Sequence, residues 1–191
     1  MSERTIKSGG VAGVLAAALF ILTAVTDIVA PIDVDYDSPH EYVYVAASTV
    51  AFLAVVVAVI GVRALAARTG RPARLATVAT WLVGVGYGVV GLLNVVNLLA
   101  GGRSLVMVRL GFAAVILVGS AILGVVVLRM HLLPWWCGVL LIVAFPVGHF
   151  ANALFASAEN ILLALLWGSV GVSLLVRATA PVEPAVRVEA G

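Results

Sequence analysis

Four ionisable side chains lie within or beside long apolar segments, where they could act as acids and bases. They are Asp27, Glu41, His149 and Glu159. An ionisable group inside a membrane span is unfavourable unless it is paired or hydrated, so each is a functional candidate. A carboxylic acid that an apolar pocket keeps protonated can protonate an alkene or an epoxide, and a second acid or a histidine can take a proton back. These four residues are the candidate catalytic groups.

Amide side chains supply candidates for ligand binding. Asn94 and Asn97 are three residues apart, and the same spacing joins His149 to Asn152, so each pair shares one helix face. Pro146 precedes the second pair and cannot donate a helix hydrogen bond, so we predict a kink that turns this pair inward. The structural alternative is that the amides hydrogen-bond to a neighbouring helix and that His149 is an interfacial residue.

Arg109 is the remaining candidate for ligand binding. It lies roughly 7 Å into its apolar segment by helical rise, a depth from which an arginine can reach the interface. It can instead pair with Asp27 or Glu159, which we expect at a similar depth, and such a pair is usually structural. Glu159 has a second structural interpretation, because it follows Ser157 at the start of the last apolar segment. The serine can cap that helix, and the acid favours the positive end of the helix dipole.

The sequence does not predict a metal, a cofactor or a nucleic acid partner. Cys137 is the only cysteine, so the chain has neither an internal disulfide nor a thiolate cluster. A metal site at His149 would need two or three further ligands, which His40 and the acids near it could supply, but nothing in their spacing indicates such a site. The GxGxxG, Walker, HExxH, GxSxG and CxxC motifs are absent. The eleven basic residues flank apolar segments, where they indicate membrane orientation.

Six apolar runs must position these candidate groups. Apolar residues make up 63% of the chain and charged residues 10%. A bilayer core about 30 Å thick takes about 20 apolar residues of helix, and the runs are apolar on every side, unlike the strands of a barrel. We therefore predict an all-α, six-helix transmembrane bundle in a lipid bilayer. The runs are approximately Gly10–Ala30, Tyr42–Ala66, Leu75–Ala100, Ser104–Met130, Leu133–Phe155 and Ala158–Val176.

The basic residues predict that both termini are cytoplasmic. With the amino terminus inside, nine of the eleven Lys and Arg residues fall in inner segments. The acids divide six to three in favour of the outer side, where we expect a polar pocket. We predict a multi-pass cell-membrane protein with a six-helix domain over residues 1–177 and a disordered cytoplasmic tail over 178–191, with the first run retained as a helix. The inner basic residues are Arg4, Lys7, Arg63, Arg68, Arg71, Arg74, Arg129, Arg177 and Arg187.

Two short segments resemble parts of small, uncharacterised polytopic membrane proteins of high-GC actinobacteria. In Arg4–Leu19 a basic start and a Gly-Gly pair precede an Ala- and Leu-rich helix, and Leu133–Gly138 reads Leu-Pro-Trp-Trp-Cys-Gly. The resemblance implies a similar layout and a similar host. It implies no activity.

Three functions are compatible with these features. The first is binding or handling of an amphipathic, lipid-like small molecule in a polar pocket at the outer face. The second is a membrane-embedded acid–base enzyme, a cyclase, isomerase or hydrolase, that acts on an apolar substrate. The third is a structural or accessory subunit, because small-residue stripes can pair helices between chains as well as within one and so form homo- or hetero-oligomers. These stripes are Gly84/Gly88/Gly91 and Gly168/Gly171.

Overall fold

The described part of the chain folds into six helices. The computed structural model of the protein describes residues 3–30, 38–69, 74–100, 106–152 and 154–179. The described residues contain no strand, which confirms the all-α prediction. The helices are α1 (Glu3–Val29), α2 (Pro39–Arg68), α3 (Arg74–Ala100), α4 (Val106–Met130), α5 (Trp135–Ala151) and α6 (Ala158–Thr179).

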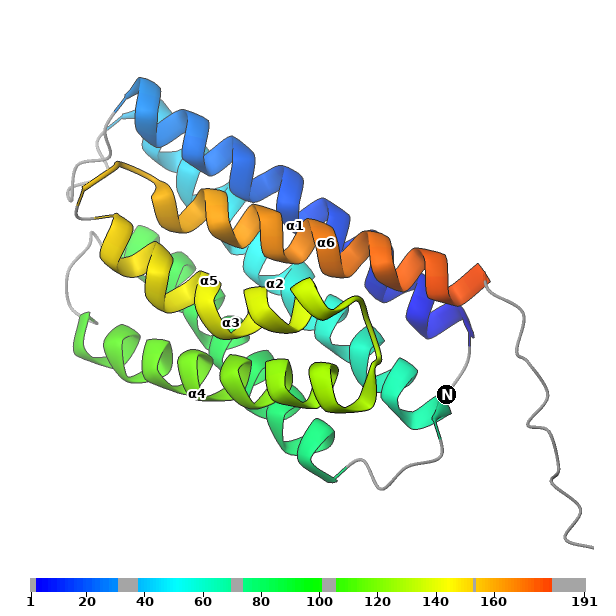
Figure 1. Ribbon diagram of the computed structural model, residues 1–191. Coiled ribbons are helices and arrows are strands. Elements are labelled where there is room, and N and C mark those ends of the chain that lie inside the picture. Colours follow the sequence, from blue (N-terminus) through cyan, green and yellow to red (C-terminus); the bar gives the residue numbers. More distant parts are fainter. Residues whose placement is uncertain (1–2, 31–37, 70–73, 101–105, 153, 180–191) are drawn as a thin grey trace, which may run out of the picture.

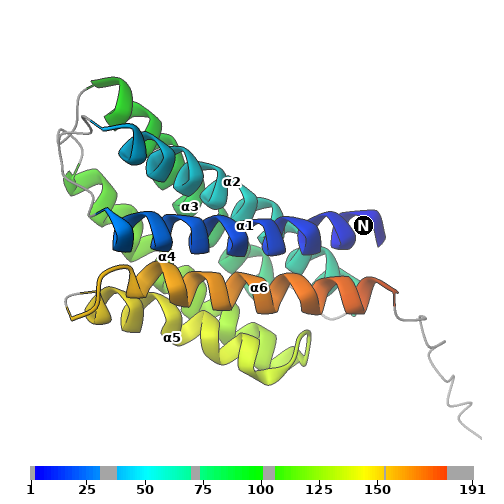
Figure 2. The ribbon, with the colours of Figure 1, turned by 90° about the horizontal axis from the view of Figure 1, so that it is seen from above.

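The six helices form a closed ring. Each helix packs against the next one along the chain, and α6 completes the ring by packing against α1 (Figures 1 and 2). Helix α2 also touches α6 across the ring. Because the number of helices is even and neighbours run in opposite directions, α1 begins and α6 ends at the same end of the bundle (Figure 1).

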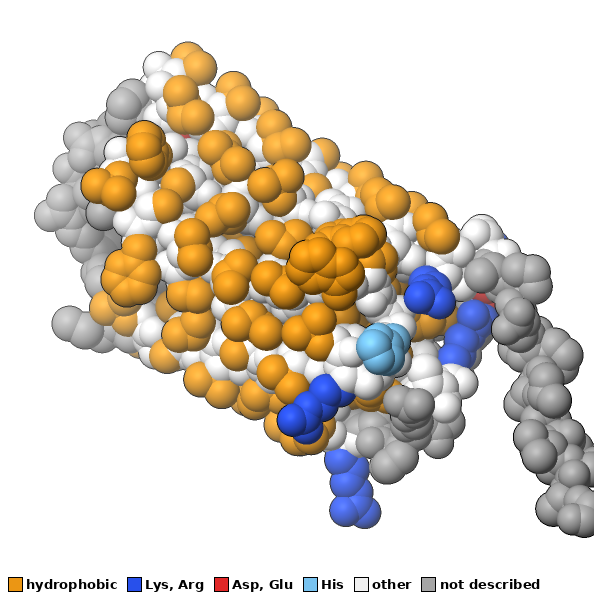
Figure 3. All heavy atoms as spheres, in the orientation of Figure 1, with side chains coloured by type: hydrophobic (Ala, Val, Ile, Leu, Met, Phe, Trp, Pro, Cys, Tyr) orange, Lys and Arg blue, Asp and Glu red, His pale blue; other side chains and the backbone are white. Residues whose placement is uncertain are grey.

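The described basic side chains gather at that shared end, which we call the basic end. On the face shown in Figure 3, apolar side chains cover the length of the bundle, and the visible Lys and Arg side chains lie at the end of the bundle that holds the start of α1 and the end of α6, some of them near the end of α4 and the start of α3. The described basic residues at this end are Arg4, Lys7, Arg63, Arg68, Arg74, Arg129 and Arg177. The charge asymmetry predicted from the sequence is therefore present in the folded chain.

Five of the six described helices are long and apolar enough to cross a membrane, as expected of a multi-pass helical bundle. The outer surface is apolar as well, with Leu15, Ile21 and Val25 of α1 about half exposed. Helix α5 is the exception to the predicted spans. It has 17 residues, roughly 25 Å of helix, and ends at Ala151 instead of continuing to Phe155.

Local sequence explains where two helices begin and end. Ser38 precedes α2, and its backbone N–H donates to the Glu41 carboxylate at 2.8 Å, while Pro39 occupies the first turn. Helix α4 ends at Met130, the next residue His131 has a left-handed φ of 49°, and the Leu132 N–H donates back to the Val127 carbonyl at 3.2 Å. This is a Schellman-type ending, so α5 follows α4 after a tight turn.

Glycines hold α1 close to both of its neighbours. A Cβ added at Gly9 would stand 2.5 Å from Gly61 Cα of α2, and one added at Gly171 of α6 would stand 2.6 Å from Val14 N. Among the predicted glycine stripes, Gly171 therefore serves a contact within the chain. Gly84 is different, because the nearest atom outside α3 to a Cβ added at this position is Val56 Cγ1 of α2, at 3.9 Å. That glycine leaves space beside α2 and does not bring two backbones into contact.

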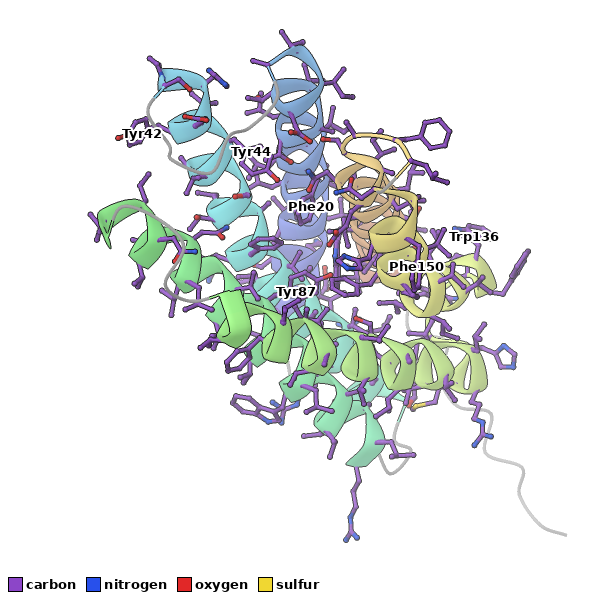
Figure 4. The ribbon with its side chains drawn as sticks, turned by 90° about the vertical axis from the view of Figure 1, so that its left-hand side faces the viewer. Phe20, Tyr42, Tyr44, Tyr87, Trp136 and Phe150 are labelled. Carbon is purple, nitrogen blue, oxygen red and sulfur yellow. The ribbon has the colours of Figure 1, made fainter. Side chains whose placement is uncertain are left out.

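A row of aromatic rings fills the centre of the ring. Phe20 meets Phe52 at 5.6 Å between ring centroids, Phe52 meets Tyr87 at 5.7 Å, and Tyr87 meets Trp167 edge-on at 5.8 Å. These rings come from α1, α2, α3 and α6, so the row connects four helices. Figure 4 shows Phe20 and Tyr87 between the helices, whereas Trp136 and Phe150 point outward. Two rings of the row, Phe52 and Tyr87, line the candidate site.

Candidate ligand-binding cavity

A cavity of about 230 Å³ lies inside the ring, between five of its helices. Its described lining combines aromatic and aliphatic side chains with one histidine and one acid. The lining residues are Phe52 of α2, Tyr87 and Val90 of α3, Leu110, Ala113 and Ile116 of α4, Phe145 and His149 of α5, and Glu159 and Leu163 of α6.

The cavity has a buried floor and an open mouth. The floor is apolar and closed, because Tyr87, Ile116 and Leu163 are each no more than 2% exposed. The exposed lining residues, which we call the mouth, include Leu110 of α4 at 53% exposure and His149 of α5, whose side chain is 66% exposed.

The polar groups at the mouth are His149 and Glu159. His149 Nδ1 stands 3.6 Å from Glu159 Oε2, within reach of an ion pair when the histidine is protonated. Gly148 makes this approach possible, because a Cβ there would stand 2.8 Å from Glu159 Cα. The histidine ring is nearly parallel to Phe145, with an angle of 4° between the planes. Helix packing thus brings a base and an acid to one cavity wall.

Asp27 takes part in a separate contact close to this wall. The hydroxyl of Ser157 donates a hydrogen bond to Asp27 Oδ2 and so joins the end of α1 to the start of α6. Ser157 is 1% exposed and has a φ of 63°, a conformation that is uncommon for a residue other than glycine. The predicted helix-capping serine thus directs its hydroxyl at the neighbouring helix.

The other predicted site residues lie away from the described cavity lining. Glu41 is 3% exposed and accepts the Ser38 N–H at the start of α2. Asn94 is 7% exposed and donates to Ser48 Oγ of α2 at 3.1 Å, which is the structural arrangement that we gave as the alternative. Asn97 lies one turn further along α3, and its Oδ1 is buried without a partner among the described residues.

Of the last two ligand-binding candidates, Asn152 is placed by the structure and Arg109 is not. Asn152 follows the end of α5, is exposed and does not line the described cavity, whereas His149 does. The side chain of Arg109 lies outside the described part of the chain, as do Asp33, Asp35 and Asp37 and the tail from residue 180. The pairing of Arg109 with Asp27 or Glu159 stays a prediction.

Sequence reasoning did not identify the aromatic lining of the cavity. Phe52, Tyr87 and Phe145 look like ordinary residues of apolar spans, and nothing in their spacing separates them from core residues. The one available signal is that Tyr87 carries a hydroxyl at the middle of its apolar run. Buried tyrosines usually lie where their polar end finds a partner or a cavity.

Comparison of the chain with protein-family models, with curated proteins and with solved structures found no match. The class is therefore defined by the fold alone, as a ring of apolar helices around a small cavity. Within the described residues no three His, Cys, Asp or Glu side chains gather in a way that could hold a metal ion. The chemistry that these residues offer is apolar contact along the floor and proton exchange or hydrogen bonding at the mouth.

Proposed function

We propose that the protein is a multi-pass membrane protein that binds a small amphipathic molecule in this cavity. The observation that carries the proposal is the division of the lining into an apolar floor at Tyr87, Ile116 and Leu163 and a polar mouth at His149 and Glu159. An amphipathic molecule satisfies both parts at once. Its apolar end displaces no hydrogen bonds from the floor, and its polar end finds two groups that can donate or accept.

The size and charge of the cavity limit the class of ligand. A volume of about 230 Å³ is below the usual range for drug-sized ligands, roughly 300 Å³ and above, so it suits one ring, a short branched chain or the end of a longer lipid. The Glu159 carboxylate disfavours an anionic head group at the mouth, because two like charges placed next to each other repel. We therefore propose a ligand with a hydroxyl or amine head, such as a terpenoid alcohol.

Access from the bilayer supports a ligand of this kind. The mouth residues Leu110 and His149 lie on α4 and α5, and the outer surface of these two helices is apolar, with Val118 53% and Val147 51% exposed. We propose that an apolar molecule dissolved in the membrane enters the cavity between these two helices.

The test fills the cavity from α4. Ala113 lines the cavity, whereas Ala114 on the same helix is exposed, so Ala113→Phe and Ala114→Phe form a matched pair. In lipid nanodiscs, geraniol at about 100 times its Kd should stabilise the wild type by about 2.7 kcal/mol, seen as a higher melting temperature. We expect Ala113→Phe to abolish this shift and Ala114→Phe to retain it.

Two further measurements test the contribution of the polar mouth to binding. Glu159→Gln should reduce the stabilisation of the protein by geraniol. Myrcene, a hydrocarbon of similar size, should stabilise the wild type less than geraniol does. Equal shifts in wild type and Ala113→Phe would contradict the proposal, because the alcohol would then act from the lipid phase.

The His149–Glu159 pair also favours the second function, acid–base catalysis on an apolar substrate. Two proton-exchanging groups meet at one apolar cavity, which is the arrangement that such a reaction requires. Glu159→Gln tests the proton transfer at alcohol concentrations that saturate this variant as well, because Gln keeps the size of the side chain and cannot exchange a proton. Conversion of the added alcohol by the wild type and not by this variant, followed by mass spectrometry, would identify an enzyme.

We also propose that the basic end of the bundle faces the cytoplasm, so that the cavity opens in the outer half of the cell membrane. Buried Cys137 is first replaced to remove background labelling. In intact cells, Asp35→Cys should then react with an impermeant thiol reagent, and Thr69→Cys, at an exposed position after α2, should not. The opposite labelling pattern would place the cavity on the cytoplasmic side.

A further inference from the structure

A second hollow lies on the outside of the ring, between α2 and α3, and the functional proposal above does not use it. It has a volume of about 360 Å³ and is separate from the central cavity, with which it shares no lining residue. Val56, Ile60 and Gly84 form its apolar part, and Arg63 and Trp81 stand at its other end. We refer to it as the Arg63 groove.

The groove runs from the basic end toward the middle of the bundle. Arg63 is five residues before Arg68, where α2 ends, and Trp81 is seven residues after Arg74, where α3 begins, so the two residues lie at a similar level on antiparallel helices. Val56 is deeper than Arg63 by roughly 10 Å of helical rise. The groove therefore combines a cation and a tryptophan at one level with an apolar channel that continues inward.

Gly84 creates the apolar channel. Outside α3 itself, the nearest atom to a Cβ added at Gly84 is Val56 Cγ1 at 3.9 Å, so the glycine leaves room that a larger side chain would occupy. Ile60 is 41% exposed and Trp81 is 60% exposed, so the two walls of the channel face outward. This surface presents space for a flexible apolar chain along the outside of two packed helices.

The charge at the Arg63 end of the groove determines which head group a bound acyl chain can carry. Arg63 has no ion-pair partner among the described residues, in contrast to Lys7, which pairs with Glu3 at 2.7 Å at the same end. The described acids Asp27, Glu41 and Glu159 lie at the opposite end of the bundle. A guanidinium with five donors above an apolar channel is complementary to a phosphate that carries an acyl chain.

We infer that the Arg63 groove binds one anionic phospholipid, with the phosphate on Arg63 and the first part of one acyl chain against Val56, Ile60 and Gly84. The exposed Trp81 indole lies beside the phosphate, at the level where membrane tryptophans meet head groups. The site differs in position and in charge preference from the central cavity, which favours an uncharged or cationic head.

Native mass spectrometry of the full chain, released from nanodiscs of equal parts phosphatidylglycerol and phosphatidylcholine, tests the inference. The wild type should retain phosphatidylglycerol in preference to phosphatidylcholine. Arg63→Gln should lower this preference by about tenfold, the effect of losing one charge-assisted hydrogen bond to the phosphate. Arg129→Gln, a change at an exposed arginine of the same end that does not line the groove, should leave the preference unchanged.

Blocking the channel tests the acyl-chain part separately. Gly84→Leu should reduce the retention of both lipids while Arg63 remains in place, and the space at Gly84 predicts that this variant folds normally. Ile60→Trp fills the groove from the opposite wall and should have the same effect. Equal lipid preference in wild type and Arg63→Gln, or an equal loss with Arg129→Gln, would overturn the inference.

Discussion

Replacement of Gly171 by alanine is expected to destabilise the protein, although alanine is the better helix former. The added Cβ would stand 2.6 Å from Val14 N and 2.8 Å from the Gly10 carbonyl oxygen, and both are backbone atoms. Neither can move unless α1 and α6 separate. We expect a loss of about 1–3 kcal/mol in the free energy of unfolding, or more if the ring opens at this contact.

Gly111→Ala is the matched control for this prediction. Apart from the backbone of α4 itself, no atom of the described residues lies within 4 Å of a Cβ added at Gly111 on α4. There the change should stabilise the helix by up to about 1 kcal/mol through propensity alone. The two substitutions are chemically identical and have opposite expected signs, so melting temperatures in one detergent decide the outcome. Stabilisation by Gly171→Ala would show that α1 and α6 are not in direct backbone contact.

Trp167 gives the second large expected effect. It is fully buried on α6 and meets the Tyr87 ring edge-on at 5.8 Å. Trp167→Ala removes the end of the aromatic row and leaves a void beside the floor of the ligand cavity. We expect it to cost about 3–5 kcal/mol, with a lower melting temperature and a larger proteolysis rate.

Trp167→Phe should cost much less, because it keeps an aromatic ring against Tyr87. It also removes the indole N–H, which is buried without a hydrogen-bond partner in the described part of the chain. Trp135→Ala controls for the loss of a tryptophan as such, since that side chain is 68% exposed, and it should be nearly neutral. An equal loss for Trp167→Ala and Trp135→Ala would contradict the position of Trp167 in the core.

The sequence determined the class of fold because of one strong constraint. A backbone in lipid has to satisfy its own hydrogen bonds, so long apolar runs separated by short polar segments predict membrane helices. The same constraint does not set the length of each helix. Helix α5 ends at Ala151, although the apolar run continues to Phe155. The chain turns there, and the Ser157 hydroxyl that follows donates a hydrogen bond to Asp27 of α1.

The sequence also named the polar residues that an apolar chain has to accommodate, but it could not decide which of them meet. Asn94 and His149 look equivalent along the chain, since each begins a pair with the same spacing. In the folded chain Asn94 is used for a hydrogen bond to Ser48, whereas His149 reaches Glu159 at a cavity wall. The difference between Asn94 and His149 arises only when the ring of helices closes, because Gly148 lets α5 approach α6 and so brings His149 to Glu159.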